Sequence, residues 1–129
     1  MRTAICLVLV SALSAAAFAQ QPVSLSTKGD FDGDGRPDTA KLTASGKSYR
    51  LVAQLSSQPR EVVIEEGNDG HYGDYLETVP PRTYTPNAAC GDTRPVTVKH
   101  DSISYGTSES SETIIFWTGK KFEQVCLGD

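Results

Sequence analysis

The chain has 129 residues, which is enough for one small domain and too few for two. Hydrophobic residues make up 38% and charged residues 22%, a composition that supports a modest core. Twelve Lys and Arg residues against sixteen Asp and Glu residues give a net charge of −4. Because no basic run is present, this balance argues against nucleic acid and against an anionic membrane surface as partners.

The first residues have the three-part layout of a secretory signal peptide. A short positive start at residues 1–3 precedes an apolar stretch at residues 4–17, and residues 17–19 (Ala-Phe-Ala) form a small-x-small cleavage site. The apolar stretch is too short for a confident membrane span, which needs about 20 residues. We expect cleavage after Ala19, so that residues 20–129 form a single periplasmic or secreted domain with no membrane insertion. An uncleaved N-terminal anchor is the alternative.

Three cysteines are present, and Cys6 leaves with the signal peptide. Cys90 and Cys126 then remain as a pair. In an oxidising compartment, two cysteines in a small domain usually bridge. We therefore predict a disulfide between Cys90 and Cys126, worth about 3–4 kcal/mol by loop-closure entropy. Two free buried thiols are the alternative.

Beyond the signal peptide, short alternating runs dominate and no stretch keeps a helical period. Eight runs are candidate strands, with the fourth left open between a strand and one helical turn: residues 39–44, 49–55, 61–65, 74–79, 96–99, 102–105, 113–117 and 121–127. Turn residues at 100–101 and 118–120 predict hairpins between the runs that flank them. The sequence thus predicts an all-β fold, a small antiparallel domain of about seven or eight short strands.

One loop carries most of the chemical information. Residues 29–38 read Gly-Asp-Phe-Asp-Gly-Asp-Gly-Arg-Pro-Asp. Alternate residues of a tight loop point to a common centre, so Asp30, Asp32 and Asp34 can place oxygens around one cation. The alternative is a solvated acidic turn without an ion.

The second half of this loop completes the predicted ligand set. Gly35 permits a sharp bend that turns the backbone carbonyl of Arg36 inward, and Asp38 closes the site directly or through a water. Four carboxylates in nine residues repel one another strongly without a counter-ion. Oxygen ligands of this number suit Ca²⁺, whereas Mg²⁺ wants fewer and more rigid ligands and Zn²⁺ prefers nitrogen or sulfur.

This loop, running straight into a strand, resembles the calcium loop of FG-GAP and VCBS-type repeats over residues 29 to about 42. Those repeats form blades of integrin-like β-propellers and recur in secreted bacterial proteins. The resemblance implies propeller-blade-like hairpins with one calcium-binding loop. It also implies that the ion is held by these residues: Asp30, Asp32, Asp34, Asp38 and the carbonyl of Arg36. A single blade cannot close a ring, so the unit must bury its sheet on itself or pair with another chain.

The candidates for catalysis are two histidines and two pairs of carboxylates. The two histidines that remain after cleavage, His71 and His100, are expected to be a solvated loop residue and a turn residue. Two carboxylate pairs are the candidates for a hydrolase: Asp69 with Asp74, and Glu65 with Glu66. Because no nucleophile elbow, metalloprotease motif or Ser-His-Asp order is present, we predict no catalytic residues and no enzyme.

The function predicted from these features is an exported, non-enzymatic calcium-binding β domain that acts as a protein-binding module. Candidate recognition surfaces are the aromatic and charged loop around Tyr72 and Tyr75, together with Tyr84, and the polar segment 104–113, whose alternative is a flexible connection. The alternative function is a periplasmic inhibitor or immunity protein against a cell-wall hydrolase, because an acidic inhibitor suits a basic cleft. A small hydrolase is the third possibility.

Overall fold

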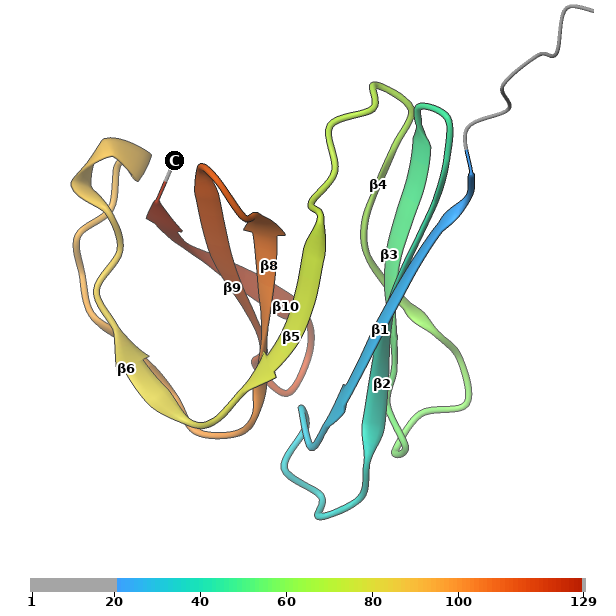
Figure 1. Cartoon of the computed structure of the whole chain (residues 1–129). Coiled ribbons are helices and arrows are strands. Elements are labelled where there is room, and N and C mark those ends of the chain that lie inside the picture. Colours follow the sequence, from blue (N-terminus) through green and yellow to red (C-terminus); the bar gives the residue numbers. More distant parts are fainter. Residues whose placement is uncertain (1–20, 129) are drawn as a thin grey trace, which may run out of the picture.

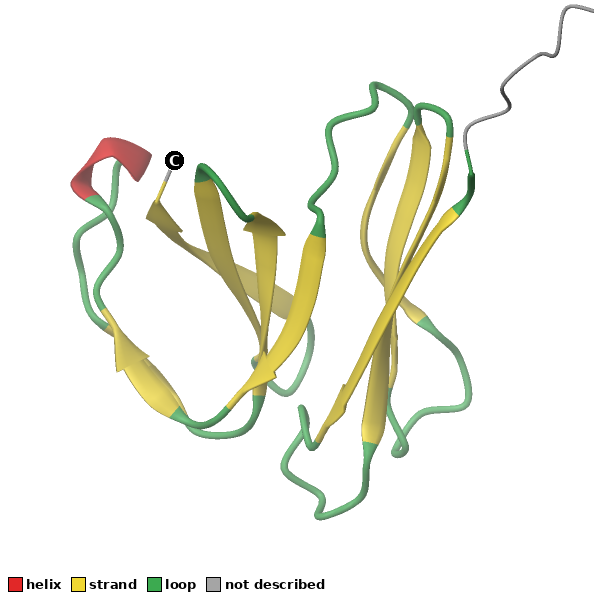
Figure 2. Ribbon diagram, viewed as in Figure 1, coloured by secondary structure: helices red, strands yellow, loops and turns green. Residues whose placement is uncertain are grey.

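A computed structural model describes residues 21–128, and within that range the fold is all-β and antiparallel (Figure 1, Figure 2). The predicted all-β, antiparallel character of the fold is therefore confirmed. Ten strands form two four-stranded sheets and one two-stranded sheet. The described part holds no helix that is both long and apolar enough to cross a membrane. The predicted signal peptide, residues 1–19, lies outside the described residues.

The first sheet, sheet A, is a meander whose neighbours follow chain order: β1 (Val23–Gly29), β2 (Asp38–Ser45), β3 (Ser48–Gln54) and β4 (Val62–Gly67). Alternation along β2 puts Ala40, Leu42 and Ala44 on the buried face. A two-residue turn joins β2 to β3, and Gly46 in that turn has a φ of 61°. The outer face of sheet A carries polar side chains such as Lys41 and Thr43, together with the exposed Val63.

The second sheet, sheet B, has the order β10-β9-β8-β5: β5 (Tyr75–Val79), β8 (Ser102–Thr107), β9 (Ser111–Trp117) and β10 (Phe122–Gly128). The predicted hairpin of the last two strands is confirmed. Trp117 lies opposite Phe122 in the register, and Gly119 in the turn has a φ of 99°. The edge strands β1 and β5 lie side by side, and the hydroxyls of Thr27 and Thr78 are 2.7 Å apart (Figure 1).

The remaining elements form what we term the hairpin arm, residues 80–101, with β6 (Arg82–Tyr84), the 3-10 turn η1 (Ala88–Cys90) and β7 (Val96–Val98). The predicted hairpin between residues 96–99 and 102–105 is wrong. Thr97 of β7 pairs with Thr83 of β6, whereas β8 pairs with β5 and β9. The strands β1 and β6 were not predicted, so the count exceeds the expected seven or eight.

Two clusters of buried side chains make up the core. The first fills the space between the sheets and includes Leu42, Leu51, Ile103 and Ile115. The second lies between sheet B and the hairpin arm, and its buried members are Tyr84, Val98, Ile114 and Val125. Sheet B is thus covered on both faces and sheet A on one, as the three layers of Figure 1 show.

Successive residues at the end of β9 belong to different clusters. Trp117 packs against the first cluster and Phe116 against the second. Both side chains are half-buried, because adjacent residues of a strand point to opposite faces and both faces are covered here. Neither ring is therefore an exposed anchor.

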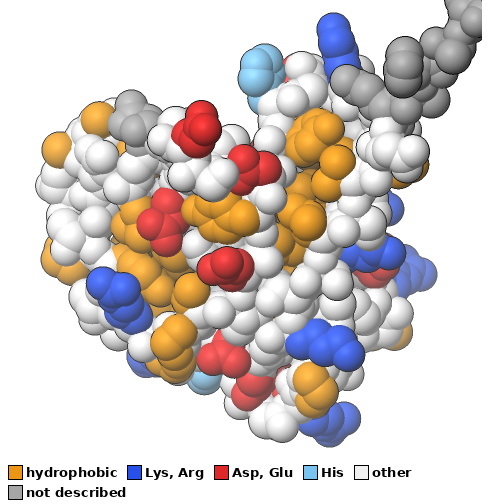
Figure 3. Space-filling model, viewed as in Figure 1, with side chains coloured by type: hydrophobic (Ala, Val, Ile, Leu, Met, Phe, Trp, Pro, Cys, Tyr) orange, Lys and Arg blue, Asp and Glu red, His pale blue; other side chains and the backbone are white. Residues whose placement is uncertain are grey.

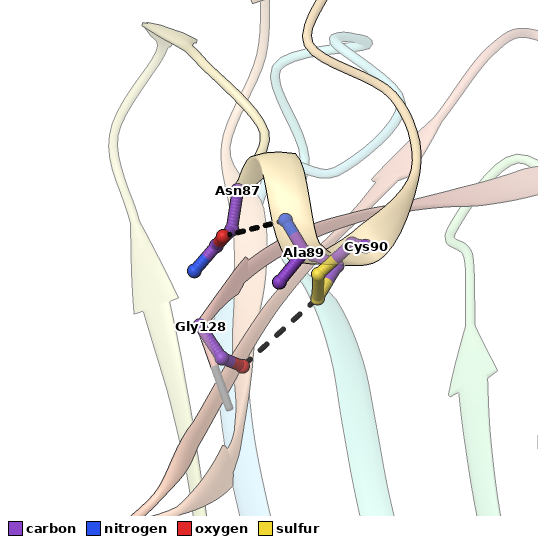
Figure 4. Close-up of a disulfide and its surroundings, with 5 residues drawn as sticks. Asn87, Ala89, Cys90 and Gly128 are labelled. Carbon is purple, nitrogen blue, oxygen red and sulfur yellow. Dashed lines mark hydrogen bonds between the residues drawn. A yellow bond between two sulfur atoms is a disulfide. The ribbon is translucent and has the colours of Figure 1, made fainter.

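The predicted disulfide is present between Cys90 and Cys126, whose Cα atoms are 6.2 Å apart (Figure 4). It ties η1 at the tip of the hairpin arm to β10. Asn87 caps η1 by accepting a 2.9 Å hydrogen bond from the Ala89 N–H. The Cys126 Sγ lies 3.9 Å from the carbonyl oxygen of Gly128. A disulfide is compatible with an oxidising, exported location.

Candidate metal centre

The acidic loop, residues 30–37, joins β1 to β2 at one end of sheet A (Figure 1). Three of the predicted ligands meet there: Asp30, Asp32 and Asp38 each place one carboxylate oxygen within 4.8 Å of the others. The backbone bends sharply at Gly33 and Gly35, with φ values of 75° and 80°. Residues with a Cβ avoid this region, so the two glycines let the loop fold back on itself.

Asp38 is the most deeply buried of the three carboxylates in the centre. Its side chain is 1% exposed, although it carries a carboxylate. One oxygen accepts the N–H of Phe31 at 2.7 Å and that of Asp32 at 3.3 Å, and the other accepts the N–H of Ser56 at 2.8 Å. A buried carboxylate is tolerated when backbone donors satisfy it. Asp38 is the first residue of β2, and through these hydrogen bonds it holds the acidic loop in place.

Asp30 has an oxygen that the described residues leave unsatisfied. Its Oδ2 accepts the N–H of Gly35 at 2.9 Å, whereas its Oδ1 is buried without a hydrogen-bond partner among residues 21–128. Leaving such an oxygen unpaired costs about 1–3 kcal/mol, and more for a charged group. This oxygen, beside the carboxylates of Asp32 and Asp38, has the chemistry of a cation ligand. The residues present therefore fit an oxygen-coordinated metal ion.

The geometry of the group suits a hard divalent cation. Ca²⁺ binds oxygens at about 2.3–2.6 Å, so two ligands of one ion lie within roughly 5 Å of each other. The 4.8 Å spread of the three carboxylate oxygens falls inside that limit. Burial is the main cause that raises the pKa of Asp32, and the charges of Asp38 and Asp34 add to it. A cation at the centre would offset the repulsion between these carboxylates.

Two of the five predicted ligands are not in that group. Asp34 turns to its neighbours: one oxygen accepts the Ser56 hydroxyl at 2.7 Å and the other the Arg36 N–H at 2.8 Å. Both hydrogen bonds lower the pKa of Asp34, and the bond from Ser56 has the larger effect. The carbonyl of Arg36 stays a predicted ligand.

Three residues outside the acidic loop contact it, and the sequence pattern does not predict these contacts. Asp101, which precedes β8, accepts the N–H of Asp30 through its Oδ2 at 3.0 Å. The ring of His100 lies against Gly33, where a side chain would stand. The Ser57 hydroxyl donates to Asp32. The first contact spans 71 positions, so no local pattern indicates it.

The carboxylates considered for a hydrolase are each bound by other residues of the fold. Asp69 accepts the N–H of His71 at 2.9 Å, and the exposed His71 ring lies 3.4 Å from the same carboxylate. Asp74 instead accepts both the N–H and the hydroxyl of Ser108 at 2.9 Å. Along β4, Glu65 bonds to Tyr49 on the core side, whereas Glu66 pairs with Arg50 at 3.5 Å. Each carboxylate thus has a separate structural partner.

The sequence matches no protein-family model and no curated protein, and the structure matches no solved structure. The interpretation of the centre therefore depends on its own residues.

Proposed function

We propose that this protein is an exported, non-enzymatic β module that binds another protein and is stabilised by Ca²⁺ in its acidic loop. The main support is the buried Oδ1 of Asp30, which has no partner among the described residues and lies in a group of three carboxylates. The ion supplies positive charge to that group. The acidic loop then holds the entry to β2 in one conformation.

The proposed ligands fall into two groups. Asp30, Asp32 and Asp38 supply the carboxylate oxygens that already lie together. Asp34 and the carbonyl of Arg36 complete the set implied by the FG-GAP and VCBS-type resemblance, and Asp34 exchanges its bond to Ser56 for this role. β1 is the first strand of sheet A, and β5 is the first strand of sheet B along the chain. These two strands lie side by side, which is consistent with two propeller-blade-like sheets.

The partner we propose carries positive charge. Glu77 and Glu112 are exposed on the same face of sheet B as the buried Ile114, and neither forms an ion pair with another described residue. Figure 3 shows acidic side chains along the middle of the face in view, over β5 and β8. Complementary charge speeds encounter. This surface favours, as the second candidate function, an inhibitor of a basic cell-wall hydrolase.

Calorimetric titration of Ca²⁺ into metal-stripped protein tests the ion site. We expect saturable binding, and at least a tenfold loss of affinity in Asp30→Asn, because one ligand oxygen is replaced by an amide. Asp92→Asn is the control: Asp92 is an exposed residue paired with Arg94, away from the loop. Absence of binding at millimolar Ca²⁺ would remove calcium from the proposal.

Capture of partners from a periplasmic extract tests the binding role. We expect a basic protein to be retained, and Glu112→Lys to reduce its recovery severalfold. Glu61→Lys, a change of the same charge at an exposed position before β4, is the matched control. If no protein is retained, or if both variants retain it equally well, the proposed acidic binding surface is wrong.

A further inference from the structure

A pocket lies between the two sheets at the end away from the acidic loop. Its volume is about 540 Å³, within the usual range for small-molecule sites. The connection between β4 and β5 lines one side of the pocket, and the inner face of sheet B lines the other. The side chains that matter for its chemistry are Glu65, Tyr72, Tyr105, Thr113 and Gln124.

Glu65 places a single carboxylate in this pocket. It is half-buried, accepts the Tyr49 hydroxyl through Oε1 at 3.0 Å, and is not part of any ion pair within residues 21–128. Tyr49 is 9% exposed. Burial is the main cause that raises its pKa to about 12, and the hydrogen bond to Glu65 is the next. The Tyr49 hydroxyl therefore stays protonated and keeps donating to Glu65, which leaves Oε2 for a ligand.

Two tyrosines, Tyr72 and Tyr105, line the same pocket as this carboxylate. The rings of Tyr49 and Tyr72 are 5.5 Å apart between centroids and tilted by 42°. Tyr105 lines the pocket from sheet B, and its oxygen is held by the N–H of Gly73 at 2.7 Å. A carboxylate beside aromatic rings attracts a cation, because the ring faces carry partial negative charge.

We propose that this pocket binds a primary ammonium group at the end of an alkyl stem, as a lysyl side chain or a small free amine presents it. An ammonium group has three donors, which Oε2 of Glu65 and the oxygens of Thr113 and Gln124 can accept. The stem lies against Tyr72 and Tyr105. An anion is disfavoured by Glu65. The inference goes beyond the proposed function and does not depend on calcium, since the acidic loop lies at the other end of the sheets.

Calorimetric titration of the calcium-loaded protein with three probes tests this site. Nα-acetyl-lysine N-methylamide and n-butylammonium carry the ammonium group, and Nα-acetyl-norleucine N-methylamide is a neutral analogue of the first. We expect both ammonium probes to saturate, with the neutral probe at least tenfold weaker. Tighter binding of the lysyl probe identifies a lysyl side chain as the ligand. Equal affinity of the two ammonium probes identifies a free amine.

Two neighbouring variants separate a binding role from a general charge effect. Glu65→Gln keeps an acceptor for Tyr49 and should weaken both ammonium probes at least tenfold. Glu66→Gln removes the same charge one residue later, where the side chain pairs with Arg50, and should leave the affinity unchanged. Tyr72→Leu, on a half-buried ring, should weaken binding severalfold while the melting temperature shows that the fold is kept.

Three results would overturn the proposal: no saturation at millimolar probe, equal affinity for the neutral probe, or an unchanged affinity in Glu65→Gln. Repeating the titration in EDTA keeps the two ideas apart. Ammonium binding that persists without calcium supports the pocket even if the acidic loop proves not to hold an ion.

Discussion

Gly33 and Gly35 belong to the same loop and have similar φ values, 75° and 80°, but their surroundings differ. The His100 ring occupies the position that a side chain at Gly33 would need, whereas nothing lies within 4 Å of that position at Gly35. An alanine in this left-handed region costs about 1–2 kcal/mol. We expect Gly35→Ala to lower the unfolding free energy by that amount and Gly33→Ala to lower it by about 1 kcal/mol more, measured by urea denaturation.

His100→Ala supplies the control for this comparison. In that background the side chain that opposes position 33 is gone, so the two alanine variants should cost the same. A double-mutant cycle measures the difference directly. If Gly33→Ala stays the more costly change without the His100 ring, contact with the hairpin arm is not the cause.

Tyr49 should make stability depend on pH in alkaline solution. In the unfolded chain this tyrosine ionises at its ordinary pKa of 10.0, whereas in the folded protein its pKa is about 12. Between these values the unfolded state releases the proton first, so the unfolding free energy falls by up to about 1.4 kcal/mol per pH unit. The contribution is complete below pH 10 and is lost by about pH 12. Tyr49→Phe should flatten this decline.

Absorbance titration of the tyrosines checks the cause. The last phenolate transition should disappear in Tyr49→Phe. In Glu65→Gln it should move to lower pH, although only in part, because burial is the larger cause and remains. A last transition unchanged in Tyr49→Phe would assign the raised pKa to another tyrosine.

At this scale the sequence predicts what is local. The spacing of the acidic loop places the bend at Gly35 correctly and brings Asp30, Asp32 and Asp38 together. It does not predict that Asp34 turns to Ser56, because that serine follows a different strand. Nor does it predict that the Asp101 carboxylate accepts the N–H of Asp30.

Among the elements, the hairpin arm depends most on a single covalent link. The disulfide joins η1 to β10 across 36 positions, and loop-closure entropy gives such a link about 3–4 kcal/mol. Replacing both cysteines by serine should lower the unfolding free energy by about 3 kcal/mol. Amide exchange should rise first at Thr83 and Thr97, where β6 and β7 pair through only three residues each. Equal loss of protection in sheet A would contradict this order.

The same arm marks the limit of prediction from patterns. Alternation and turn residues predict β2, β3 and the β9–β10 hairpin because each of these depends on neighbours in the chain. β7 has an equally good local turn at residues 100–101, yet it pairs with β6 across the prolines and η1. The arm covers Ile114 and Val125, and burial of that surface outweighs a tight turn to β8.

For the whole molecule, the acidic loop is the place where the two sheets are joined at one end. Phe31 leaves the loop for the core between the sheets and is 1% exposed. The neighbouring Asp30 N–H donates to Asp101 at the start of β8. Ordering the loop therefore also positions sheet A against sheet B.

Chelation of calcium should therefore lower the melting temperature and loosen the boundary between the sheets. A bound ion contributes about 2.7 kcal/mol at a hundredfold excess over its Kd, which corresponds to a shift of about 10 °C for a domain of this size. Asp32→Ala combined with Asp34→Ala should remove the shift. In EDTA, amide exchange should rise along β1 and β5, the edge strands of the two sheets that lie side by side. An unchanged melt in EDTA, for protein first shown to contain calcium, would mean that the ion does not stabilise the fold.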